Sequence, residues 1–236
     1  MAKVGDNISA GNANWSFSGE VAASFDAHVS KSVPFYHQGH ELIAKLSDFF
    51  VGEDSLAYDV GCSTGTLLVH LAERNREKKA RFIGIEPEAG MVEQARRRTQ
   101  AFGSIAIEQA DFFDVALEKC DLITSYYTIQ FVRPRRRQAF FDKAFEALNW
   151  GGGFIFFEKV RAPDARFQDM MSLLYTDYKL EAGYDAEEIV AKARSLKGVL
   201  EPFSTQANMD MAKRAGFQDI VTIFKYVCFE GFLAIK

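Results

Sequence analysis

The chain has 236 residues, of which 48% are hydrophobic, and this predicts one large domain, or one domain with a cap, around a sizeable core. Its 28 Lys and Arg residues against 32 Asp and Glu residues give a net charge of −4, which argues against a nucleic-acid partner. Three cysteines without C-x-x-C spacing, a polar N-terminus and the lack of a long apolar run predict a cytoplasmic protein with no structural metal and no membrane partner.

Apolar periodicity predicts the order of helices and strands. Residues 1–16 are rich in Gly and Asn and are expected to be loosely structured, and amphipathic helices are expected over 20–29 and 38–50. Strands and helices then alternate, which is typical of a doubly wound, mostly parallel sheet. The expected strands are 56–60, 81–85, 105–109, 122–126, 154–158, 220–226 and 228–234, and the expected helices among them are 67–74, 89–101, 138–148 and 209–215.

Residues 160–204 interrupt this alternation with helical patterns and no strand, which predicts a helical cap over the ligand edge of the sheet. We therefore expect an α/β, Rossmann-like fold of seven strands with an N-terminal helical lid and a cap insertion. Its expected parts are the lid (1–50), the core (51–159), the cap (160–204) and a closing helix with a strand pair (205–236).

Two short motifs flank the helix expected over 138–148. The basic run Arg133-Pro134-Arg135-Arg136-Arg137 is expected to be a solvated helix start, because no aromatic residue is interleaved with it for stacking on nucleic acid. The glycines of residues 149–153 are expected to end the helix as a C-cap.

The most informative motif is a short apolar strand that ends on Asp59 and breaks into the turn Gly61-Cys62-Ser63-Thr64-Gly65. Glycine allows a sharp turn and a close approach of a ligand to the main chain. The turn lacks the G-x-G-x-x-G spacing and the Lys-Ser/Thr pair of phosphate-binding loops. An acid at the strand end suits an ammonium group instead, which points to the amino-acid tail of S-adenosylmethionine (SAM). We expect Asp59, Gly61, Ser63 and Gly65 to bind it.

Suitable groups also follow the next three strands. Glu86 comes directly after the second strand, where a carboxylate can accept both ribose hydroxyls. Asp111, followed by Phe112, can accept the exocyclic amine of adenine, and Met91 can pack on the adenine face. Tyr126 ends the fourth strand. This order and spacing predict a class I methyltransferase fold that binds SAM, although Asp59 and Asp111 could instead be capping residues and Met91 a core residue.

Further motifs extend over most of the chain, and they include Trp15-Ser16-Phe17, Ser32-Val33-Pro34-x-Tyr36, Thr128-Ile129-Gln130-Phe131, Glu158-Lys159, Asp177-Tyr178-Lys179, Gly183-Tyr184 and Lys192-x-Arg194-Ser195. With the glycine turn, they resemble the carboxy-S-adenosylmethionine synthases, relatives of the class I methyltransferases that modify SAM itself. The resemblance implies a homodimer and a reaction with prephenate. It also implies that Tyr36 and Arg194 reach the SAM site, with Arg194 coming from the same subunit or from the neighbouring one.

The chain departs from that family at the reactive end of the site. The family has an asparagine where this chain has Tyr126, a histidine pair where it has Tyr175-Thr176, and an aspartate where it has Glu86. The groups for SAM are thus kept while the reactive end becomes aromatic, which puts carboxyl transfer to the sulfonium in doubt.

An aromatic reactive end favours ring closure within SAM. Tyr126, Tyr175 and Tyr178 could surround the sulfonium by cation–π attraction. Tyr36 or Asp177 could accept the ammonium proton, and Arg194 could bind the α-carboxylate bidentately. The amino nitrogen would then attack its own γ carbon and give azetidine-2-carboxylate and methylthioadenosine.

The chain is also similar to the azetidine-2-carboxylate synthases of nonribosomal peptide pathways. Three alternatives remain open: carboxy-SAM synthesis, methyl transfer to a small molecule, and SAM binding without catalysis. Tyr175 and Tyr178 could also be a packed helix face, and Arg194 a solvated helix residue.

Overall fold

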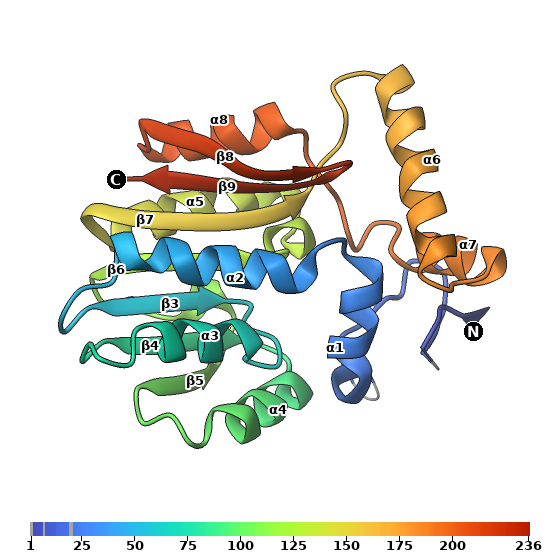
Figure 1. Ribbon diagram of the computed structural model, residues 1–236. Coiled ribbons are helices and arrows are strands. Elements are labelled where there is room, and N and C mark those ends of the chain that lie inside the picture. Colours follow the sequence, from blue (N-terminus) through green and yellow to red (C-terminus); the bar gives the residue numbers. More distant parts are fainter. Residues whose placement is uncertain (1, 7, 19–20) are drawn as a thin grey trace.

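The computed structural model describes residues 2–6, 8–18 and 21–236, and its centre is one sheet of seven strands (Figure 1). The strand order is β5-β4-β3-β6-β7-β9-β8; the first five run parallel, and β9 is antiparallel to both β7 and β8. The chain adds β4 and β5 on one edge of β3 and then adds β6 and β7 on its other edge. Ligands of open α/β sheets bind at the point where the strand order reverses in this way. The strands are β3 Leu56–Val60, β4 Arg81–Glu86, β5 Ile105–Gln109, β6 Cys120–Tyr126, β7 Leu148–Lys159, β8 Asp219–Tyr226 and β9 Phe229–Ile235.

The core lies on both faces of the sheet. In β7, the side chains of Phe154, Ile155, Phe156 and Phe157 are all fully buried. Because successive side chains point to opposite faces, Phe154 and Phe156 pack in one hydrophobic cluster and Ile155 and Phe157 in another. A strand covered on both faces reads as a continuous apolar run, which is the pattern that the sequence presents.

The two faces of the sheet are covered by helices from different parts of the chain. The first cluster contains residues of α5 (Pro134–Ala147) and α8 (Thr205–Ala215), and the second contains residues of α2 (Tyr36–Leu46) and α3 (Thr66–Arg74). The helix α4 (Ala89–Thr99) packs beside α3 and β5. This arrangement confirms the predicted α/β, Rossmann-like fold.

The remaining helices gather at one end of the sheet. Figure 1 shows α1 (Val21–Ser32), α6 (Ala165–Glu181) and α7 (Ala186–Ser195) beyond the ends to which the parallel strands point. The short strands β1 (Ala2–Lys3) and β2 (Ser9–Ala10) lie there too. The two cap helices therefore form where helical patterns without a regular strand were expected.

The N-terminal stretch is more ordered than its composition predicts. β1 and β2 pair antiparallel, and Val4, Ile8 and Trp15 are buried in a cluster with Val21 and Met91. The expectation of a loose segment was wrong because a few apolar residues among the Gly and Asn residues find a surface to pack against.

One expectation at the end of α5 was wrong, and one at its start holds only in part. Gly151 and Gly152 do not cap the helix but belong to β7, where Gly151 N donates to Lys236 O (2.8 Å) and Lys236 N to Gly152 O (3.0 Å). The basic run begins the helix and is exposed at Arg133 and Arg135, as expected, but Arg137 is only 2% exposed and donates to the carbonyls of Val132 (2.8 Å) and Gln130 (3.0 Å). Pairing with the C-terminus and burial of a long side chain are tertiary effects, so the local sequence does not reveal them.

Among the helices that the structure describes, none is both long and apolar enough to cross a membrane.

Candidate active site

A cavity of about 490 Å³ lies at the carboxyl ends of the parallel strands, under α1 and the cap. Its volume is in the range of small-molecule sites. Eight of the predicted site residues line it, which are Tyr36, Asp59, Gly61, Ser63, Glu86, Met91, Tyr126 and Tyr175. The structure therefore brings together side chains from β3, β4, β6, α2 and α6 around one space.

Asp59, at the end of β3, is the most buried acid on the cavity wall. Its side chain is 2% exposed and accepts a hydrogen bond from Thr124 Oγ1 at 2.7 Å. Burial raises the pKa of Asp59 to about 7, and the nearby Glu86 adds to the shift. A cation bound beside this carboxyl would favour its charged form, so the site fits a ligand ammonium group.

Glu86 is held beside the glycine turn by main-chain donors. Its carboxylate accepts hydrogen bonds from Ser63 N (2.9 Å) and Glu88 N (3.0 Å), and burial raises its pKa. Gly61 has a φ of +72°, and a Cβ atom there would collide with the side chain of Thr128. The oxygens of Glu86 keep lone pairs for two ribose hydroxyls, and the bare backbone at Gly61 leaves room for a ligand, so these residues fit the adenosine part of SAM.

Tyr126 forms an aromatic wall with Tyr36 and His40. The Tyr126 hydroxyl donates to the Tyr36 carbonyl at 2.7 Å, and the two rings lie 5.1 Å apart. The His40 ring lies 4.6 Å from each of them, and its buried Nδ1 has no partner among the described residues. Burial raises the pKa of the Tyr36 hydroxyl, which therefore stays protonated at neutral pH and is a weak base.

This wall depends on Gly39, a residue that the sequence did not single out. A Cβ atom at Gly39 would collide with the Tyr126 hydroxyl. The glycine lies in the middle of α2, where it would otherwise only weaken the helix. A glycine at a helix position with no local need for one is the signal that could have identified this contact.

Tyr175 lines the cavity in a different role from the expected cage. Its hydroxyl donates to Ser32 O at 2.8 Å, and its ring centroid lies 4.1 Å from Lys159 Nζ and 4.5 Å from Lys179 Nζ. Tyr178 stacks beside Tyr175, with ring centroids 6.3 Å apart, but does not line the cavity. The ring of Tyr175 therefore contacts two ammonium groups of the protein, and a sulfonium cage made by Tyr175 and Tyr178 is not formed in this conformation.

Asp177 and Arg194 also lie away from the cavity. Asp177 is exposed on α6. On α7, Lys192 and Ala193 line the cavity, whereas Arg194 lies on another side of the helix with Asn12 and Glu187. A role for Arg194 in this site consequently needs another arrangement of the helix or a second subunit.

Three of the predicted SAM-binding residues have structural contacts instead. Asp111 caps a short 3-10 helix through Phe113 N (2.9 Å) and pairs with Arg136 at 3.5 Å. Phe112 is buried against Phe140, with ring centroids 4.4 Å apart. Gly65 is the N-cap of α3, with a φ of +79°. None of these three residues lines the cavity, and their binding roles remain predictions.

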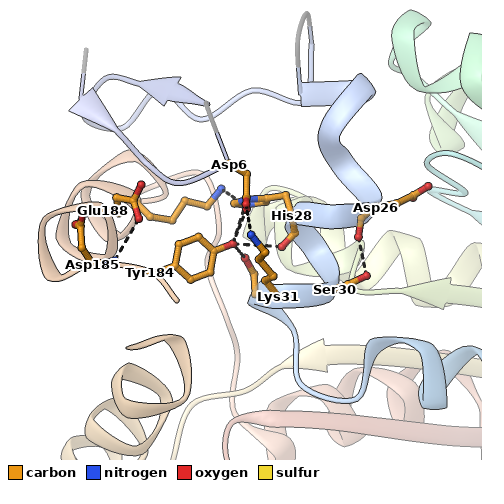
Figure 2. Close-up of polar contacts among 10 residues, drawn as sticks. Asp6, Asp26, His28, Ser30, Lys31, Tyr184, Asp185 and Glu188 are labelled. Carbon is orange, nitrogen blue, oxygen red and sulfur yellow. Dashed lines mark hydrogen bonds and ion pairs between the residues drawn. The ribbon is translucent and has the colours of Figure 1, made fainter. Parts of the chain in front are cut away.

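A polar network, drawn in Figure 2, includes the cavity-lining residues His28 and Tyr184. Asp6 accepts hydrogen bonds from Lys31 (2.6 Å), from the Tyr184 hydroxyl (2.8 Å) and from His28 Nδ1 (2.8 Å). Burial opposes ionisation, but these three donors outweigh it and lower the pKa of Asp6 to about 2. Lys192 Nζ lies 3.1 Å from His28 Nε2. The network joins the N-terminal segment, α1 and the cap, and its members are too far apart in sequence for any local pattern to reveal it.

Three more cavity residues were missed by the sequence reasoning. Tyr127 has a φ of +59°, which is strained for a tyrosine, and its buried hydroxyl has no partner among the described residues. Lys159 and Lys179 were noticed only as parts of motifs. In residues 2–6, 8–18 and 21–236, no group of three or more His, Cys, Asp and Glu side chains could hold a metal ion.

Comparison with known proteins identifies relatives of the whole chain. Residues 57–152 match a family model described as a methyltransferase domain. The chain is 37% identical to the carboxy-S-adenosyl-L-methionine synthase of Campylobacter lari and 38% identical to that of Sulfurimonas denitrificans, in both cases over 225 residues that cover 93% of this chain and 94% of the relative. Human N-acetylserotonin methyltransferase, solved in complex with SAM, superimposes with a TM-score of 0.58 at 15% identity, covering 94% of this chain and 60% of that one, and shares its fold.

Proposed function

This chain belongs to the carboxy-S-adenosyl-L-methionine synthase family of SAM-dependent enzymes with the class I methyltransferase fold, and we propose that it consumes SAM as a substrate. The proposed reaction is ring closure of the methionine part to azetidine-2-carboxylate, with release of methylthioadenosine. The observation that carries the proposal is the pair of aromatic rings that Tyr36, on α2, and Tyr126, at the end of β6, place on the cavity wall.

Aromatic rings are suited to bind a sulfonium and to hold the methionine tail of SAM in a folded, reactive conformation. Each ring face beside a desolvated cation contributes about 0.5–2 kcal/mol. Tyr126 is fixed by its hydrogen bond to Tyr36, so its ring does not need to be ordered when the ligand binds. A tail held with its amino nitrogen close to its own γ carbon reacts without a second substrate, and effective molarity provides much of the rate.

The nitrogen must lose a proton before it can attack. Asp177 is exposed and the Tyr36 hydroxyl is a weak base, so we assign this step to Asp59, whose pKa of about 7 suits a base at neutral pH. The α-ammonium gives one proton to the Asp59 carboxylate. The nitrogen lone pair then forms the bond to the γ carbon, and the electrons of the breaking carbon–sulfur bond neutralise the sulfonium. Asp59 afterwards passes its proton to solvent.

Closing a strained ring also requires that water be excluded. Trp15 and Phe17 line the cavity, with ring centroids 5.9 Å apart, and Phe17 contacts Phe131 at 4.9 Å. The Asp6 network fastens the segment that carries these rings to α1 and the cap. The lid expected from the N-terminal residues would thus act as a water barrier.

Carboxy-SAM synthesis from prephenate is the second candidate. It is supported by the names of the relatives and by the lysines Lys159 and Lys179 on the cavity wall, which suit an acidic substrate. Methyl transfer to a small molecule is a third reaction of the same fold, and it would leave S-adenosylhomocysteine.

One experiment separates these reactions. Purified protein is incubated with SAM alone and with SAM plus prephenate, and the products are identified by mass spectrometry. Ring closure gives equal amounts of methylthioadenosine and azetidine-2-carboxylate in both tubes. A cofactor product that gains mass only with prephenate, without methylthioadenosine from SAM alone, would replace ring closure by carboxy-SAM synthesis. Recovery of unchanged SAM in both tubes would remove both candidates.

We propose a homodimer as the working assembly. Phe167, Met170, Leu173 and Leu174 are exposed apolar side chains on α6, and Arg194 lies on the outer side of α7. A second copy could cover the apolar side chains and receive Arg194 in its cavity. Sedimentation velocity tests the assembly, and a single monomer boundary at micromolar concentration would reject it.

A further inference from the structure

We propose that Lys159, Lys179 and Tyr127 form a binding subsite for a ligand carboxylate on the cap side of the cavity, an inference that rests on the proposed use of SAM there. The two lysines belong to the part of the cavity wall that suits an acidic substrate, and Tyr127 lines the same cavity.

The two lysines reach the same aromatic ring from different elements. Lys159 is the last residue of β7, and its Nζ lies 4.1 Å from the ring centroid of Tyr175. Lys179 follows Tyr175 by one helical turn on α6, and its Nζ lies 4.5 Å from the same centroid. The hydrogen bond from Tyr175 to Ser32 O fixes this ring. Both ammonium groups are therefore positioned on the cavity wall.

Neither ammonium group has an anionic partner. Over the described part of the chain, no carboxylate lies within 4.0 Å of either Nζ atom and no side-chain hydrogen bond is made by them. Glu158 precedes Lys159 but projects from the opposite face of β7, where it accepts from Ile129 N at 3.0 Å. Burial and mutual repulsion lower the pKa of Lys179 to about 8. Partly buried cations without a counterion are costly, which favours a bound anion.

Tyr127 adds a neutral donor to this wall. It follows β6 with a left-handed backbone conformation, and its ring lies 5.7 Å from Phe229, the neighbour of Lys159 across the strand pair. Its hydroxyl is buried and has no hydrogen-bond partner among the described residues. A buried hydroxyl without a partner is rare, so a ligand acceptor is the expected partner.

The subsite thus combines two ammonium groups and a hydroxyl, and the nearest carboxylate in sequence points away. This set of donors matches a carboxylate. The methionine tail of SAM carries one, and so does a small organic acid bound beside SAM. Both sources have the same chemistry, and binding measurements distinguish them.

The test uses isothermal titration of the intact protein with SAM, with decarboxylated SAM and, on the SAM complex, with prephenate. The variants are Lys159→Met, Lys179→Met and Tyr127→Phe, and the matched control is Lys213→Met, an exposed lysine on α8 outside the cavity. Methionine keeps much of the side-chain volume and removes a buried charge, so we expect the variants to fold, as thermal unfolding will verify.

If the subsite holds the methionine carboxylate, wild type prefers SAM over decarboxylated SAM by about tenfold or more, and each lysine variant loses most of this preference without weaker binding of decarboxylated SAM. If the subsite holds a second acid, the lysine variants keep their affinity for SAM, and their SAM complexes no longer bind prephenate. The proposal is overturned when the lysine variants bind all three ligands as Lys213→Met does. Because these are binding data, a protein that shows the preference but forms no methylthioadenosine would contradict the proposed function and leave the subsite intact.

Discussion

The hydroxyl of Tyr126 lies 2.7 Å from the carbonyl oxygen of Tyr36, directly over the position where any residue but glycine at 39 would place its Cβ atom. Three residues from α2 and β6 thus form one unit. The unit makes the end of β6 an aromatic wall of the cavity.

Replacing Gly39 tests how strictly this unit is packed. Gly39→Ala is expected to displace the Tyr126 ring and to destabilise the fold by about 1–3 kcal/mol, because overpacked cores are strained. Removal of the hydroxyl in Gly39→Ala/Tyr126→Phe should restore part of that loss. Urea unfolding of the two single variants and the double variant measures the coupling, and strictly additive effects would mean that the contact is not formed.

Two substitutions at Tyr126 separate its ring from its hydroxyl. Tyr126→Phe keeps the ring face and should retain methylthioadenosine formation from SAM within about threefold, whereas Tyr126→Asn removes about 0.5–2 kcal/mol of cation–π stabilisation, or about 2- to 30-fold in rate. The readout is the single-turnover rate at saturating SAM. Equal rates for Asn and Phe would show that the aromatic face does not take part.

Asp59 should control the pH dependence of the reaction. The pKa of about 7 predicts that kcat/KM of the free enzyme rises with pH and levels off above that value, since only the carboxylate accepts a proton. Asp59→Asn should abolish the reaction, while Asp177→Asn, an exposed acid of the same type, should leave it within about twofold. If kcat/KM of the wild type does not change between pH 5 and 8, Asp59 is not the base.

The same shift makes a prediction about stability. A carboxyl whose pKa is raised on folding stabilises the fold fully below its unfolded value of 3.8 and progressively less as the pH rises to about 7. Unliganded Asp59→Asn should therefore gain stability relative to wild type between pH 5 and pH 8. Denaturant unfolding at these two pH values measures the difference, and SAM should stabilise only the wild type.

The contribution of Asp6 to folding stability has the opposite pH dependence. Its pKa is lowered to about 2, so its contribution is present above the unfolded value of 3.8 and is lost as the pH falls toward 2. At neutral pH, Asp6→Asn should release the N-terminal segment from His28 and Tyr184. We expect faster hydrogen exchange at residues 8–18 with unchanged exchange in β3 and β6, together with slower ring closure. Unchanged exchange in both regions would show that the network does not fasten the lid.

The sequence by itself determined the sheet and the position of the ligand edge. Asp59 and Gly61 were identifiable because a buried strand that ends on an acid and a glycine turn have requirements set within a few residues: a positive φ and a bare backbone at Gly61. The strands were identifiable because β7 is buried on both faces and therefore has no polar residue from Phe154 to Phe157.

Only the tertiary structure decided which helical side chains face the cavity. Lys192 and Ala193 do so while the adjacent Arg194 does not, because a step of one residue turns a helix by about 100° and the phase is set by packing. Tyr175 contacts Lys159, and Gly39 leaves room for Tyr126. The partners of each pair are far apart in the sequence, so no local pattern encodes these contacts. The residues proposed to bind the nucleoside follow from local backbone chemistry, whereas the aromatic end of the cavity is assembled from elements brought together by folding.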